Sequence, residues 1–130
     1  MKKVETQDVI FSIEDEILHC SYKQQLEIDI ETARRIIKDR VEFTEGKMYP
    51  ILIDFSNMKA ATKEARDYMN SPEGGLKGLI GGAFLSKSVM ATLFINLYIK
   101  VSNPAIPARF FTNKEEAISW LKKIRAEKTD

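Results

Sequence analysis

The stretch YPILIDF at residues 49–55 decides the fold class of this chain, because it is apolar without interruption up to Asp54. A strand that faces water on one side alternates between apolar and polar residues, whereas a strand buried on both faces of a parallel sheet does not. The runs at residues 79–85 and 108–111 have a similar character. The three runs predict parallel strands in an α/β fold whose helices cover both faces of the sheet.

Helices are predicted between and after these strands, over residues 30–43, 62–70, 88–101 and from 112 onwards. Asp29 precedes the first of them, where its carboxylate can accept a hydrogen bond from a free amide of the first turn. Thr112 and Glu115 have the spacing of a capping box at the start of the last helix. These signals predict where the helices begin.

Two apolar alternations precede the first helix, Val9-Phe11-Ile13 and a second one from Ile17, and an acidic turn at residues 14–16 separates them. This pattern is typical of a β-hairpin. The predicted order is β-β-α-β-α-β-α-β-α, in one domain over residues 1–130, with a mixed, mostly parallel sheet of five strands and about four helices. The expected core comprises Phe11, Ile37, Ile51, Ile53, Leu79, Phe84, Phe110, Trp120 and Leu121.

Composition excludes several classes of protein. The 130 residues are 44% hydrophobic and 30% charged, which is typical of a soluble globular domain. A formal net charge of +1 gives no field to attract nucleic acid. Glycine, serine and lysine interrupt the apolar run at residues 78–99, so no membrane span is expected. Cys20 is the sole cysteine, and with no signal-peptide pattern at the start we expect a reducing, cytoplasmic setting.

Several stretches carry a resemblance to a known family. They are residues 49–55, Ala65-Arg66-Asp67-Tyr68, Asn96, Asn103-Pro104 with Pro107, and above all Arg109-Phe110-Phe111-Thr112 followed by Glu116-Ala117-Ile118-Ser119-Trp120-Leu121. With the order of elements, they make nearly the whole chain resemble STAS-like domains. The resemblance is strongest to the SpoIIAA-like small bacterial proteins, which are also compared with CRAL-TRIO lipid-binding domains. It implies a STAS-like fold and a regulatory, protein-binding role.

The resemblance also indicates where a phosphorylation switch would lie. In the anti-sigma-factor antagonists of this family, phosphorylation of a serine breaks the partner complex. That serine starts the helix after the strand equivalent to residues 49–55. In residues 57–64 the family's Asp-Ser-Ser-Gly signature is absent, and only Thr62 offers a hydroxyl. A threonine here is well suited to cap a helix, which is the role we expect of Thr62.

Titratable side chains do not indicate catalysis. His19 and Cys20 are neighbours, so on a strand they point to opposite faces and cannot form a pair of nucleophile and base. With one histidine and one cysteine, the common zinc ligand sets cannot form. We therefore expect no enzyme activity, no metal and no cofactor.

Polar side chains at two places could instead hold a small ligand or an anion. Asp54 and Ser56 stand at the carboxyl end of a predicted central strand, where α/β sheets bind ligands, although an aspartate there also satisfies loop amides. Ser86 and Ser88 precede the helix at residues 88–101, where they could cap it or help its free amides to bind an anion. The candidate ligand or anion site comprises Asp54, Ser56, Thr62, Ser86, Ser88 and Asn96.

Glycines gather between residues 74 and 82, but their order is neither a Walker A pattern nor a dinucleotide fingerprint. Inside the predicted strand at residues 79–85, Gly81 and Gly82 are expected to let a helix approach the strand closely.

The helix predicted at residues 88–101 is apolar almost all round, apart from a narrow stripe of Ser88, Thr92, Asn96 and Lys100. A helix that covers a sheet needs a narrower apolar face than this. A neighbouring helix, a second copy in a homodimer or a regulatory protein could cover the rest. The alternative is that the domain is a carrier or sensor of a small apolar, lipid-like ligand, held in a groove beside this helix. The candidate interaction surface comprises Met90, Phe94, Leu97 and Tyr98.

Overall fold

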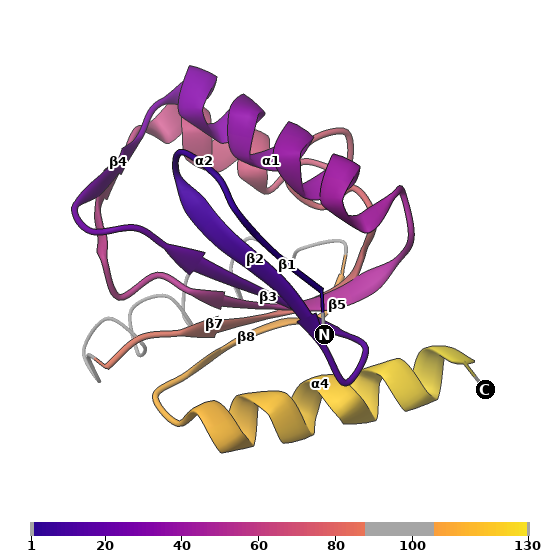
Figure 1. The fold of residues 1–130 in the computed structure, drawn as a ribbon. Coiled ribbons are helices and arrows are strands. Elements are labelled where there is room, and N and C mark those ends of the chain that lie inside the picture. The colour runs from indigo at the N-terminus through magenta and orange to yellow at the C-terminus, as the bar shows by residue number, and fades with distance from the viewer. Residues whose placement is uncertain (1, 88–105, 130) are drawn as a thin grey trace.

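The computed structural model describes residues 2–87 and 106–129. Its main sheet has six strands in the order β1-β2-β3-β5-β7-β8 (Figure 1). The pairs β1–β2 and β2–β3 are antiparallel, and β3–β5, β5–β7 and β7–β8 are parallel. A mixed, mostly parallel sheet with an N-terminal hairpin is therefore confirmed. The strands are β1 Lys2–Glu5, β2 Val9–Glu14, β3 Ile17–Tyr22, β5 Tyr49–Asp54, β7 Leu79–Leu85 and β8 Ala108–Phe111.

Three strands go beyond the five that the sequence predicts, so that number is wrong. β1 adds a sixth strand to the main sheet, and β4 (Leu26–Ile28) pairs with β6 (Met58–Ala61) in a parallel two-stranded sheet. All four residues of β1 are exposed, so its sequence lacks an apolar alternation. β4 and β6 are too short for a period-two pattern to stand out.

The helices cover both faces of the main sheet. α1 (Ile30–Thr44) and α2 (Lys63–Met69) lie on one face, and α4 (Lys114–Thr129) lies on the other (Figure 1). The helix predicted at residues 88–101 lies outside the described residues. Among the described helices, none is long and apolar enough to cross a membrane.

The caps of α1 and α2 are those that the sequence predicts. The Asp29 carboxylate accepts a hydrogen bond from the amide of Thr32 at 2.8 Å. The Thr62 hydroxyl accepts one from the amide of Ala65 at 3.1 Å. Both residues therefore satisfy one of the free amides that a helix leaves in its first turn.

The predicted cap of α4 is wrong by one residue. The side-chain oxygen of Asn113, rather than the Thr112 hydroxyl, accepts a hydrogen bond from a first-turn amide, that of Glu116, at 3.0 Å. An asparagine caps a helix as well as a threonine does. The pattern of Thr112 and Glu115 thus matched a capping box only by its spacing.

The sheet separates two hydrophobic cores. The larger lies on the side of α1 and α2, and the smaller packs α4 against the sheet. Phe84 and Trp120, which were expected in the core, are only half-buried and pack against its margins. The other predicted core residues are buried: Phe11, Ile37, Ile51, Ile53, Leu79, Phe110 and Leu121.

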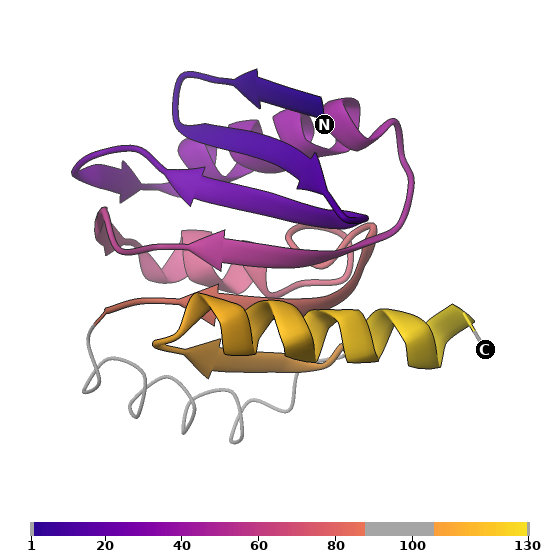
Figure 2. The same cartoon turned by 60° about the horizontal axis from the view of Figure 1, so that its bottom comes forward.

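Gly81 explains how α4 comes so close to β7. A Cβ atom at this position would lie 3.3 Å from Cγ2 of Ile124 in α4 and 3.3 Å from the carbonyl oxygen of Pro107. α4 crosses this part of the sheet (Figure 2). The predicted close approach of a helix is confirmed at Gly81.

Candidate functional site

The carboxyl ends of β3, β5, β7 and β8 lie at one edge of the sheet, because these strands run parallel. At the end of β5, the Asp54 carboxylate accepts a hydrogen bond from the amide of Ser56 at 3.0 Å. The alternative role of Asp54, that of satisfying a loop amide, is the one observed. Ser86 is buried after β7, and its amide donates to the carbonyl of Phe111 at 3.1 Å.

The candidate ligand residues are therefore engaged locally where the structure describes them. Asp54 and Ser56 hold the turn after β5, Thr62 caps α2, and Ser86 is part of the backbone pairing next to β8. Ser88 and Asn96 lie outside the described residues, as does the predicted interaction surface of Met90, Phe94, Leu97 and Tyr98.

A groove of about 560 Å³ runs beside α4 and is formed by β8, the turn after it and the first half of the helix. We call it the α4 groove. Residues on α4 line it at positions four apart, which places them on one side of the helix. Its lining residues are Arg109, Phe111, Asn113, Glu115, Glu116, Ser119, Trp120 and Lys123.

Aromatic rings form the apolar part of the α4 groove. The rings of Phe111 and Trp120 lie 5.6 Å apart between centroids, with their planes tilted by 53°. The Arg109 guanidinium lies 5.1 Å from the centroid of Phe111, in a cation–π contact. Phe111 is buried, whereas Trp120 is half-buried and Arg109 is exposed. The groove thus offers an indole surface beside a held guanidinium.

Charges of both signs surround these rings. Arg109 and Lys123 supply positive charge, and Glu115 and Glu116 supply negative charge in the first turn of α4. Among the lining residues there is neither a cysteine nor a histidine, so the groove offers no thiol or imidazole for nucleophilic or acid–base chemistry. The arrangement is suited to binding. In the sequence these residues have only the pattern of packing and capping positions, because β8 and α4 combine into a groove only in the fold.

His19 and Cys20 lie on opposite faces of β3, as predicted. His19 lines a small hollow of about 90 Å³ next to Lys114, and burial, reinforced by the charge of Lys114, holds the pKa of the imidazole below its usual value. Cys20 is buried in the larger core, and burial raises the pKa of its thiol to about 12. A thiol with such a pKa is not a nucleophile at neutral pH.

Arg40 is a buried cation that fixes the turn between α2 and β7. One Nη donates to the carbonyl of Gly75 at 2.9 Å and the other donates to the carbonyl of Lys77. Burial lowers the pKa of the guanidinium. At Gly75, a Cβ atom would lie 1.8 Å from the carbonyl oxygen of Met69, so this glycine serves a tight turn against the end of α2.

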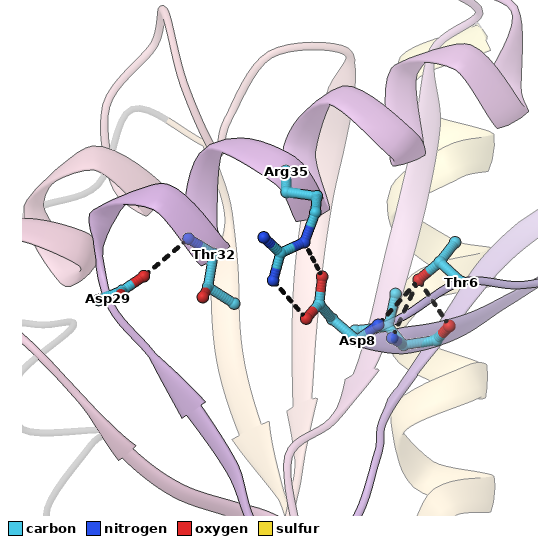
Figure 3. Close-up of polar contacts among 6 residues, drawn as sticks. Thr6, Asp8, Asp29, Thr32 and Arg35 are labelled. Carbon is cyan, nitrogen blue, oxygen red and sulfur yellow. Dashed lines mark hydrogen bonds and ion pairs between the residues drawn. The ribbon is translucent and has the colours of Figure 1, made fainter.

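Asp8 and Arg35 form a two-pronged ion pair that the sequence does not indicate (Figure 3). Nε and one Nη of Arg35 donate to the two carboxylate oxygens at 2.7 and 2.8 Å. The Thr6 hydroxyl oxygen accepts from the amides of Asp8 and Val9 in the same turn. This cluster ties the β1–β2 turn to α1, and its residues have local structural partners.

No metal centre is found among the described residues, since nowhere in them do three or more histidine, cysteine or acidic side chains gather as ligands would. Of the arrangements described above, the α4 groove is best suited to hold another molecule, because it combines two aromatic rings with an arginine.

The family model of a domain of unknown function, DUF7793, matches residues 11–125, which is most of the chain. The chain belongs to this family. No curated protein matches the sequence of this DUF7793 domain. β1 and the start of β2 precede the matched residues.

Solved structures relate the DUF7793 domain to a known fold. An uncharacterized protein of the DUF3478 family with a SpoIIAA-like fold, from Shewanella loihica PV-4, is similar at a TM-score of 0.60 and 14% identity, over 92% of this chain and 90% of that one. A protein of unknown function from Arthrobacter sp. FB24 is 20% identical over 91% of this chain and 95% of that one, at a TM-score of 0.34. The first similarity confirms the SpoIIAA-like fold that the sequence resemblance implies.

Proposed function

We propose that this DUF7793 domain is a non-enzymatic protein-binding module of the SpoIIAA-like class, and that it binds its partner along the α4 groove. The observation that carries the proposal is the pairing of Trp120 and Phe111 at the groove with the cation of Arg109. Tryptophan and arginine are the side chains that contribute most often to binding energy at protein interfaces.

The positions of the potentially reactive side chains favour binding over catalysis. Cys20 is buried with its pKa raised to about 12, and His19 lies on the opposite face of β3. Asp54, at the edge where α/β sheets usually carry their sites, is bonded to its own loop. A catalytic site would need a nucleophile, a base and an orienting group that converge on one point.

Native mass spectrometry of the chain, purified from the cells that naturally make it, tests the proposal. We expect a protein complex, with this chain or another, that Arg109→Ala weakens by about tenfold, because a held arginine at an interface contributes about 1–2 kcal/mol. Lys128→Ala is the matched control, since Lys128 is an exposed cation on α4 that does not line the groove. A turnover that Asp54→Ala abolishes in a folded protein would contradict the proposal.

A second candidate function is that of a carrier for a small apolar, lipid-like ligand. The rings of Phe111 and Trp120 favour it, since they give the open α4 groove an apolar part, and the groove's volume of about 560 Å³ could hold a small molecule. The same spectra distinguish the two functions. A retained small molecule adds a mass of a few hundred daltons to the monomer, whereas a protein partner adds the mass of a whole chain.

A further inference from the structure

The outward side of α4 carries acidic residues near its N-terminus and basic residues farther along, so that reading the helix in the opposite direction exchanges the signs of the charges. Glu115 and Glu116 lie in the first turn, and Lys122 and Lys123 follow seven residues after them. Residues seven apart on a helix lie about two turns apart and on nearly the same side. The four residues therefore form two rows along α4, each negative toward the N-terminus and positive toward the C-terminus.

These four side chains are exposed, as is Ser119 between them. Within residues 2–87 and 106–129, none of the four takes part in an ion pair, whereas Arg125 elsewhere on α4 is paired with Glu16. The spacing of these four residues also prevents pairing among them inside the helix. Lys123 stands four residues before Glu127, but no ion pair joins these two in the described part of the chain. The positions three and four residues after the two glutamates are occupied by Ile118, Ser119 and Trp120. The charges are thus available to another molecule.

We propose that two copies of this domain associate through antiparallel α4 helices that cross at Ser119. The inference rests on the protein-binding function proposed above and names a second copy as the partner. A two-fold axis that passes beside Ser119, perpendicular to the helix, makes the two helices antiparallel. Each row then lies against the same row of the second copy, running in the opposite direction. Glu115 then faces Lys122 of the second copy, Glu116 faces Lys123 of the second copy, and both pairs occur twice. A parallel arrangement would instead place like charges together.

The side chains at and beside the crossing point suit a close approach. Ser119 is small, so the two helix backbones can come near each other at the axis. Trp120 lies on the side of α4 that faces the groove. The same axis brings this side of each copy together, so the two α4 grooves adjoin and both indoles lose contact with water. This burial is needed because exposed ion pairs alone contribute little to affinity.

Charge reversal tests the inference by sedimentation velocity, with circular dichroism to confirm folding. Glu115→Lys/Glu116→Lys makes both rows positive, and Lys122→Glu/Lys123→Glu makes both rows negative. Each variant alone should dissociate about a hundredfold more readily than the wild type, because four attractive contacts become repulsive. An equimolar mixture of the two variants should associate again, since a positive row then meets a negative one.

The matched control is Glu31→Lys/Glu42→Lys. It makes the same change in net charge as Glu115→Lys/Glu116→Lys, but at exposed positions of α1 on the other face of the sheet. We expect it to associate like the wild type. Wild-type association that both α4 variants retain would overturn the inference, as would two folded variants that stay monomeric when mixed. A wild type that is monomeric at high micromolar concentration also overturns it. If native spectra of that monomer show another protein bound, the proposed function stands without self-association.

Discussion

At the scale of single residues, Asp8 shows how a buried charge is accommodated in this fold. Its side chain is 5% exposed, and its partner Arg35 is 39% exposed. Arg35 also has its pKa raised, first by the hydrogen bonds to Asp8. The pair spans 27 residues of sequence, so no local pattern could have predicted it. Short-range contacts such as the caps at Asp29 and Thr62 were predictable because both partners lie within three residues.

Asp8→Asn should lower the free energy of unfolding by about 1–3 kcal/mol, because it removes the charge that balances Arg35. The loss stays moderate because Arg35 still reaches water. Urea unfolding followed by circular dichroism measures this change. Glu5→Gln is the control: Glu5 pairs with Lys23 in an exposed ion pair, so its removal should lower the free energy of unfolding far less than Asp8→Asn does. Equal losses for the two variants would show that the Asp8 contact has no special weight.

At the scale of elements, two adjacent glycines in β7 have different surroundings. A Cβ atom at Gly81 would lie 3.3 Å from Cγ2 of Ile124 in α4, whereas one at Gly82 would lie 3.6 Å from Cγ2 of Ile51, an ordinary contact. Gly81 is thus the position at which β7 allows α4 to approach. The contact between α4 and the sheet in turn fixes one wall of the α4 groove against β8.

Alanine substitutions should separate these two glycines. Gly82→Ala should leave the free energy of unfolding unchanged or raise it by up to about 1 kcal/mol, because alanine restricts the unfolded chain more than glycine does. Gly81→Ala should be less stable than Gly82→Ala by about 1 kcal/mol, since Ile124 or Pro107 must move to make room. Urea midpoints measured side by side decide the order. Gly81→Ala as the more stable variant would contradict the close approach of α4.

The sequence predicted those elements that are long or strongly patterned. The buried runs of β5 and β7 and the apolar spacing of α1 were sufficient, whereas β1, β4 and β6 were not predicted. β1 is exposed at all four positions and is held by pairing with β2, which is a tertiary contact. Short strands of this kind are determined by their neighbours more than by their own residues.

At the scale of the whole molecule, the two faces of the sheet differ in what they bury. α1 and α2 lie over one face of the sheet and α4 over the other (Figures 1 and 2). The larger core lies under α1 and α2, and the smaller one under α4, with Trp120 half-buried at its margin. The sequence could not locate the α4 groove, because the side chains of Phe111 and Trp120 meet only when β8 joins the sheet edge and α4 returns across it. The fold class could be predicted from the hydrophobic pattern of the sequence. The α4 groove could not, because it depends on how β8 and α4 are placed in the fold.

The fluorescence of Trp120 tests most directly whether the α4 groove is the binding surface. This residue is the sole tryptophan of the chain, so selective excitation reports on the groove alone. If the groove is the surface through which copies associate, dilution of the wild type should shift the emission to longer wavelength, because the indole then meets water. Glu115→Lys/Glu116→Lys should show the shifted emission at every concentration. Emission that stays constant while sedimentation shows the wild type dissociating would contradict the account and place the interface elsewhere.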